Sequence, residues 1–169
     1  MREALIQTLM ASLGAAGFGI LFNVHGRKLL WIAFGGGLGW QVYLSCEHFG
    51  FGLFLSLFFA TVAVVTFSEI LSRVLKTPVI LFLVPMLIPL VPGGGLYYMM
   101  DALVRDNAAE AALRLESVAL QVGAIAGGLT VMTSIMGNFF TFYYRRKAKK
   151  TQKERKPSAV LRRVVFYRW

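Results

Sequence analysis

Hydrophobic residues along the chain form five long uncharged segments, separated by short clusters of charged residues. A membrane-spanning helix needs roughly 20 apolar residues, with a range of about 17–25. Each uncharged segment is close to that length or longer, so the pattern predicts five membrane-spanning helices. The segments are Ala4–Gly26, Leu29–Cys46, His48–Ser68, Thr77–Met100 and Ser117–Tyr144.

The composition agrees with a membrane protein and disfavours a soluble domain. Of the 169 residues, 57% are hydrophobic and only 15% are charged, and the mean hydropathy is +0.63. Soluble domains of this size are usually less apolar and more charged. We therefore expect an all-α, polytopic membrane helix bundle, with residues 1–144 as the transmembrane domain and residues 145–169 as a basic cytoplasmic tail.

The first segment could be mistaken for a cleavable secretory signal. Its charged start is weak, because Glu3 follows Arg2 directly, and the segment ends at Arg27 and Lys28, as a span before a cytoplasmic loop would. We therefore expect a retained membrane span.

The fourth segment contains a break that a continuous helix does not tolerate. Pro85, Pro89 and Pro92 are spaced four and three residues apart, and Gly93–Gly95 follow. Each proline lacks an amide donor and disrupts the preceding helical turn. A helix that begins at Pro78 extends only about 20 Å before the break, so the break lies within the depth of the membrane. Non-helical backbone at that depth must be buried in protein or line a wet cavity.

Two interpretations of the break remain open. Free carbonyls before it and free amides after it could bind the ammonium and carboxylate of a small solute, as in transporters with discontinuous helices. Alternatively, the break is a kink that serves only packing. The candidate substrate-binding residues of this segment are Pro89, Pro92, Gly93, Gly94, Gly95 and Tyr97.

Other functional classes lack the residues that they need. The glycine stretch has neither the lysine nor the Ser/Thr of a nucleotide-binding loop, and no nucleophile with a paired base is visible, so we expect no enzyme. Cys46 is the only cysteine, and His25 and His48 are far apart, so we expect no metal and no cofactor.

Polar residues in the other segments are weaker candidates. Glu69 lies near the end of the third segment, where a carboxylate suggests function, but Arg73 follows four residues later and could form a simple helical ion pair with it. Both interpretations of Glu69 stay open. Asn23, at the end of the first segment, is a further substrate-binding candidate. Gln121 could line a polar path or bond to a neighbouring helix.

The basic residues predict the orientation of the chain, because Arg and Lys favour short cytoplasmic loops. With five spans and the N-terminus outside, fifteen of the 18 basic residues are cytoplasmic, eleven of them in the tail; Arg2, Arg105 and Arg114 stay outside. If Thr77–Met100 is re-entrant, the split is only twelve to six. We expect the tail to lie near anionic lipids. Nucleic-acid binding is not expected, because no fold organises basic and aromatic side chains there.

Small residues recur at four-residue spacing and predict close helix packing. The pairs are Ala15 with Gly19, Gly35 with Gly39, and Gly123 with Gly127. Residues 106–117 are rich in helix formers, with Asp106 or Asn107 placed to cap. We expect a short helix there, on the outer face and separate from the last span.

Four stretches resemble the threonine/serine exporter family of the ThrE type, and in particular its short, YjjB-like half. They are "LFNVHGRKLLW", "GGGLGW", "SEILSRVLKTP" and "FLVPMLIPLVPGGGLYYMM". The similarity runs from about Ala4 to Tyr144, and the segment from Lys76 to Met100 is its most specific part. Met86 departs from the glycine that is frequent in the family, and this leaves open whether the helix opens at Pro85 as well.

The resemblance implies export of threonine and serine across the cytoplasmic (inner) membrane, driven by the proton gradient. It also implies a larger, YjjP-like membrane subunit as a partner in a hetero-oligomer. Two alternatives remain: a subunit of an exporter of dicarboxylates such as succinate, and a structural subunit that scaffolds a larger transporter half.

Overall fold

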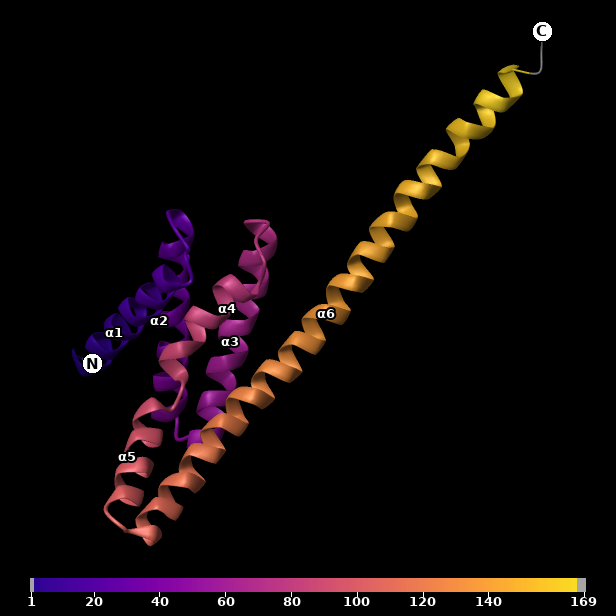
Figure 1. Ribbon diagram of the computed structural model, residues 1–169. Coiled ribbons are helices and arrows are strands. Elements are labelled where there is room, and N and C mark those ends of the chain that lie inside the picture. The colour runs from indigo at the N-terminus through magenta and orange to yellow at the C-terminus, as the bar shows by residue number, and fades with distance from the viewer. Residues whose placement is uncertain (1, 167–169) are drawn as a thin grey trace. The chain divides into compact units, whose positions relative to one another are not determined.

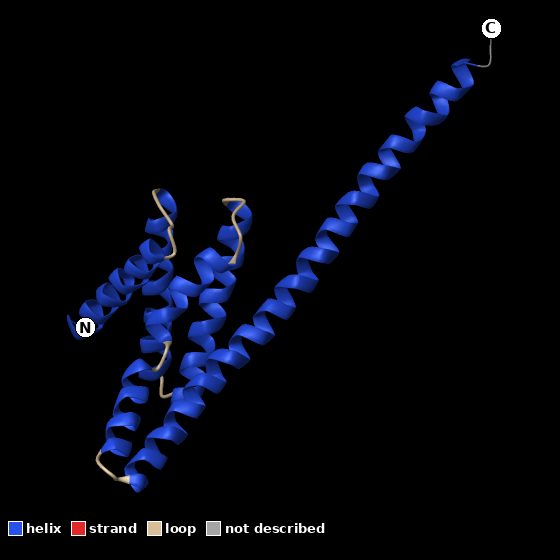
Figure 2. Cartoon of the chain, viewed as in Figure 1, coloured by secondary structure: helices blue, strands red, loops and turns tan. Residues whose placement is uncertain are grey.

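The structure is a computed structural model that describes the backbone of residues 2–166 and the side chains of residues 2–138. The described chain consists of helices joined by short connections (Figure 2). In chain order they are α1 (Arg2–Leu21), α2 (Arg27–His48), α3 (Leu53–Val74), α4 (Ile80–Leu87), the 3₁₀ helix η1 (Ile88–Leu90), α5 (Gly93–Val104) and α6 (Ala108–Phe166). The chain divides after Met132 into two compact units.

The predicted membrane helix bundle is confirmed by the lengths and hydropathy of these helices. α1, α2, α3 and residues 108–138 of α6 are each long and apolar enough to cross a membrane. The pair formed by residues 80–90 and α5 passes the same test as one bent unit, with an angle of 52° at the break. The described residues therefore provide four membrane-spanning helices, or five if the bent pair counts as one span.

The expected separate helix over residues 106–117 is not found, because α6 continues without interruption into the last span. Asn107 caps this helix: its Oδ1 accepts from the Glu110 amide at 3.2 Å, and its Nδ2 donates to the Glu110 carboxylate at 3.2 Å. From Ala108 to Ser117 nearly every residue is a good helix former and none is proline. Nothing in that stretch ends the helix, so the amphipathic start and the apolar span form one element.

Four helices end in the same way, with one residue in the left-handed region just past the last turn. The φ angles are +59° at Asn23, +79° at Gly50, +49° at Lys76 and +61° at Asp106. In each case the next amide bonds to the carbonyl five residues earlier, for example from Val24 to the Gly19 carbonyl at 2.9 Å. This Schellman pattern satisfies the last carbonyls of a helix. It allows the chain to turn sharply into the next helix.

The centre of the first unit is α4, which packs against α1, α2 and α3. Phe82 and Met86 of α4 are fully buried. Gly35 of α2 has no side chain where Met86 approaches it, and the Ser68 hydroxyl of α3 donates to the Met86 sulfur at 3.3 Å. The helix continues through Pro85 and does not open there.

Small residues mediate the close contacts between helices, in part as predicted. Ala15 of α1 packs directly on Gly36 of α2, so the close contact uses Gly36. On α6, Gly123 and Gly127 lie against phenylalanine rings of α3, and the closest approach is at the adjacent Gly128, where a Cβ would lie 2.9 Å from Thr61.

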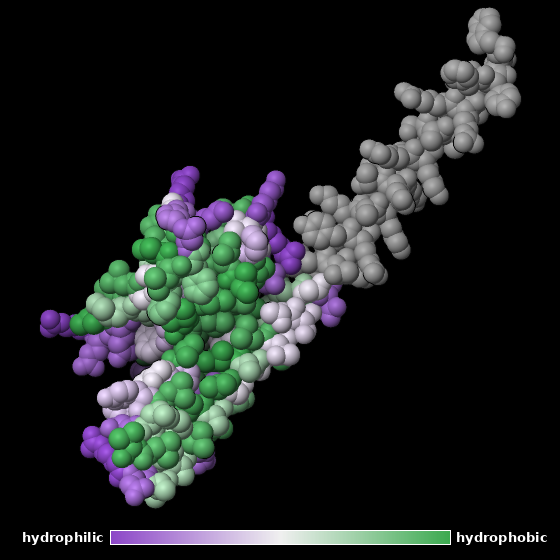
Figure 3. All heavy atoms as spheres, in the orientation of Figure 1, coloured by the Kyte–Doolittle hydropathy of each residue, from purple (hydrophilic) through white to green (hydrophobic). Residues whose placement is uncertain are grey.

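Charged side chains gather near the ends of the helices in the first unit, and the surface between them is mostly apolar (Figure 3). The connections after α1 and after α3 lie at the same end of this unit (Figure 1). Those connections and the adjoining helix ends carry Arg27, Lys28, Arg73 and Lys76. The connection between α5 and α6 lies at the opposite end. Charges at these two ends, and at the start of α1 where Arg2 and Glu3 lie, thus border an apolar surface.

Candidate functional site

The break is short and lies near the middle of the bent pair. α4 and η1 together cover about 16 Å and α5 about 18 Å, at ~1.5 Å per residue. Only two residues separate these halves: Val91 is extended, with φ −67° and ψ 133°, and Pro92 has φ −75° and ψ 57°. Gly93, Gly94 and Gly95 are not part of the irregular backbone, because they form the first turn of α5.

Backbone groups without helical partners remain on both sides of the break. The Gly93 amide donates to the Val91 carbonyl at 2.7 Å, and the first regular bond of α5 runs from Leu96 to Pro92 at 3.1 Å. The amides of Gly94 and Gly95 therefore precede the helical ladder, as at any helix start. On the other side, Pro89 has no N–H to donate to the carbonyl one turn earlier.

A groove lies beside the start of α5, between α5 and α6, with a volume of about 590 Å³. Glu110 and Arg114 of α6 form an ion pair there, with 3.3 Å between Arg114 Nη2 and Glu110 Oε1. The Arg114 guanidinium lies 5.7 Å from the centre of the Tyr98 ring. The remaining lining residues are Gly94, Gly95, Leu113, Ser117 and Gln121. An acid, a base and two glycines from the first turn of α5 therefore line the same groove.

A second hollow of about 340 Å³ lies on the other side of the break, between α1, the Trp40 side of α2 and η1. Its lining is mostly apolar and includes Ile88 and Pro89. The polar groups in its wall are the Gln7 side chain and the Trp40 indole, whose Nε1 donates to Gln7 Oε1 at 3.3 Å.

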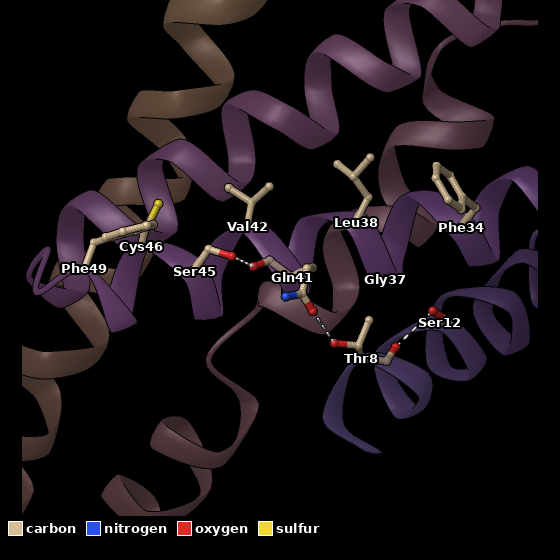
Figure 4. A pocket seen from close by; sticks show the side chains of 10 residues that line it. All are labelled: Thr8, Ser12, Phe34, Gly37, Leu38, Gln41, Val42, Ser45, Cys46 and Phe49. Carbon is tan, nitrogen blue, oxygen red and sulfur yellow. Dashed lines mark hydrogen bonds between the residues drawn. The ribbon is translucent and has the colours of Figure 1, made fainter. Parts of the chain in front are cut away.

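A third hollow, of about 500 Å³, lies along α1 and the opposite side of α2. Figure 4 shows Thr8 of α1 beside Gln41 of α2 and Ser12 beside Gly37, with Ser45 farther along α2. The Thr8 hydroxyl and the Gln41 side-chain amide are 3.0 Å apart, and the Ser12 and Ser45 hydroxyls bond to carbonyls of their own helices. None of the residues predicted for the site lines this hollow.

The predicted site residues are distributed over several places. Pro89 lines the hollow between α1 and η1, whereas Gly94 and Gly95 line the groove between α5 and α6. Pro92 and Gly93 lie between these places. Tyr97 is exposed and outside the groove, and its ring contacts that of Tyr98, which lines it.

Glu69 and Asn23 line none of the three hollows. Glu69 forms an ion pair with Arg73, with 3.0 Å between the carboxylate and the guanidinium, and only 13% of its side chain is exposed. Asn23 is the left-handed residue that ends α1, and its carbonyl is 2.9 Å from His25 Nδ1. Local bonding therefore accounts for both residues, and their roles in binding stay predictions.

Sequence reasoning assigned no site role to the ion pair of the groove, to Tyr98, or to the Gln7–Trp40 pair. A signal was present on α6: polar residues recur with spacings of four, three and four at Glu110, Arg114, Ser117 and Gln121. Such spacing places side chains on one helix face. Among the described residues, no group of three or more His, Cys, Asp or Glu side chains comes together as a metal site requires.

Comparison with known protein families matches residues 7–135 to the threonine/serine exporter family, ThrE. The match covers most of the chain and includes the break, the groove, and every residue except Ile6 that lines the hollow between α1 and η1. The chain belongs to this family. As a ThrE-family protein with several apolar spans, it is a multi-pass membrane protein of a transporter family. No solved structure matches this ThrE chain.

Proposed function

We propose that this ThrE-family chain is the membrane subunit of an exporter of small hydroxy amino acids, threonine and serine, driven by the proton gradient. The solute path passes the break between η1 and α5. The observation that carries this proposal is a bent helix pair interrupted near its middle, where the glycines that start α5 line a groove that also holds the Glu110–Arg114 ion pair. Such an interruption is tolerated only beside protein or water.

The charges in the groove favour an amino acid over a dicarboxylate. Glu110 and Arg114 offer one negative and one positive group to the same space. Both side chains are about half exposed, so their mutual ion pair is worth only about 0–1 kcal/mol and can open. A zwitterion matches this pair, with its carboxylate toward Arg114 and Gly94 and its ammonium toward Glu110. A dianion meets a repelling carboxylate.

The same proposal includes a larger, YjjP-like membrane partner and a place in the cytoplasmic membrane. α5 supports a partner, because Ala102 is its only buried residue. A purely scaffolding subunit is the competing function, and the two differ in how they respond to changes in the groove.

The test is a matched pair of valine substitutions at adjacent glycines. A Cβ at Gly93 or at Gly94 meets no atom within 4 Å, so there is open space where a side chain would start at both positions. Only Gly94 lines the groove. We expect Gly94→Val to abolish threonine efflux from cells loaded with a threonine dipeptide, and Gly93→Val to retain most of it. Co-purification with the partner controls for assembly. Normal efflux through an assembled Gly94→Val complex would show that the solute does not pass through the groove, and it would favour the scaffolding function.

A further inference from the structure

The hollow between α1 and η1 contains a polar group whose orientation is determined by its neighbour. The Trp40 indole Nε1 donates to Gln7 Oε1 at 3.3 Å. An indole nitrogen can only donate, so the oxygen of the Gln7 amide must face Trp40. The Gln7 –NH₂ group, with two donors, therefore points away from Trp40. The described structure gives this nitrogen no partner.

The contact between Thr8 and Gln41 joins the same two helices but can use one of the amide's two donors. The Thr8 hydroxyl has one proton, and its shorter contact, at 2.7 Å, is to the Ala4 carbonyl. The hydroxyl can also accept, so a Gln41 amide turned by 180° donates its nitrogen to Thr8 across the 3.0 Å contact. The Thr8 hydroxyl is thus satisfied and Gln41 uses one of its two amide protons, whereas Gln7 retains both of its donors.

The place of Gln7 in the hollow makes this difference significant. The other lining residues, apart from Trp40, are apolar: Ile6, Met10, Ala11, Gly14, Ile88 and Pro89. Gln7 is itself an exposed residue, so a solute that enters the hollow can reach its two donors. Pro89, in the same wall, leaves the Pro85 carbonyl without its usual donor. The hollow therefore brings together the two free N–H donors of Gln7 and the helical turn in which the Pro85 carbonyl lacks its usual donor.

We propose that this hollow is a solute-binding site on the Pro89 side of the break, and that Gln7 is its specificity-determining residue. The Gln7 –NH₂ group donates to an acceptor of the solute, a carboxylate or hydroxyl oxygen, and Trp40 holds the amide in that orientation. This inference rests on the proposed export function. It assigns roles in solute binding to Gln7 and Trp40 on the Pro89 side of the break. The groove lined by Gly94 is the proposed binding place on the α5 side.

The experiment compares Gln7→Leu with Gln41→Leu in the full chain with its partner. Each variant removes one side-chain contact between α1 and α2, and only Gln7 lines the hollow beside Pro89. Because a hydrogen bond to a charged group is at stake, we expect Gln7→Leu to lower threonine efflux about tenfold or more. Gln41→Leu leaves efflux within about twofold of wild type. Equal efflux of the two variants overturns the inference.

A labelling experiment reports on the hollow without relying on efflux. In a Cys46→Ser background, Met10→Cys places a single thiol in the wall of the hollow between α1 and η1. The native Cys46 is replaced because it lines the third hollow, along α1 and the opposite side of α2. We expect a membrane-impermeant maleimide to label residue 10, threonine to slow that labelling, and Gln7→Leu to abolish the protection. Absence of protection by threonine overturns the inference. If protection is present while Gly94→Val exports normally, the hollow binds solute and the groove proposal alone fails.

Discussion

At the scale of single residues, Asn23 shows how a polar residue near a membrane helix end serves the backbone. Its φ of +59° places it in the left-handed region, where Asn is tolerated better than most residues. The amide of Asn23 bonds to the Ile20 carbonyl at 2.9 Å, and that of Val24 to Gly19 at 2.9 Å. The side chain is exposed and lines none of the hollows, so a backbone role accounts for it.

We expect substitution of Asn23 to change stability rather than transport. Asn23→Gly should keep or slightly raise the melting temperature, because glycine adopts positive φ freely. Asn23→Val should cost about 1–2 kcal/mol, because a β-branched residue is strained there. Both should export threonine at the wild-type rate per assembled complex. The measurements are thermal unfolding in detergent and efflux. A folded Asn23→Gly complex that fails to export would indicate that the Asn23 side chain takes part in solute binding.

At the scale of helices, hydropathy and proline predicted much of what is observed. The five apolar segments and the interruption before α5 follow from local composition, which the sequence displays directly. Whether Gly93–Gly95 belong to the irregular backbone could not be predicted, since glycine is compatible with a turn and with a first helical turn. The continuity of α6 was missed, because the charged and the apolar stretch were treated as different elements.

The start of α5 offers a test of packing that is independent of transport. A Cβ on Gly95 would lie 2.8 Å from Val118 Cγ2 of α6, whereas one on Gly94 meets nothing within 4 Å. We expect Gly95→Ala to destabilise the assembled protein by about 1–3 kcal/mol through overpacking. Val118→Ala should restore part of that loss in the double variant, and Gly94→Ala should have little effect on stability. Thermal unfolding of the wild type, Gly95→Ala, Val118→Ala and the double variant measures the coupling, with Gly94→Ala as the control. Additive effects would mean that α5 and α6 do not touch there.

At the scale of the whole molecule, the missed residues are those that depend on which helices become neighbours. Pro89 and Gly94 were predicted, because the break itself marks them. Arg114 lines the groove because α5 packs beside α6, and Gln7 contacts Trp40 because α1 crosses α2. Sequence alone treats Arg114 as one more external charge. Helix pairing, which depends on small-residue contacts far apart in sequence, could not be predicted from periodicity.

Orientation is the last property that the charges predict, and the fold makes it testable. The connections after α1 and α3 lie at the same end of the first unit, and they and the adjoining helix ends carry four basic residues. Each basic side chain near an anionic cytoplasmic surface contributes about 1 kcal/mol. We therefore expect an outside N-terminus and a cytoplasmic C-terminal tail.

Reporter fusions at three positions measure this topology and decide whether the bent pair spans the membrane. Fusions within residues 75–79 and after Tyr144 should be fluorescent with a cytoplasmic reporter and inactive with a periplasmic phosphatase. A fusion in the connection between α5 and α6, at residue 107, should behave in the opposite way, because α4, η1 and α5 together cover about one bilayer thickness. If the fusions at 75–79 and 107 report the same side, the pair is re-entrant. A periplasmic signal after Tyr144 would contradict the five-span orientation, since it would place the tail's eleven basic residues outside.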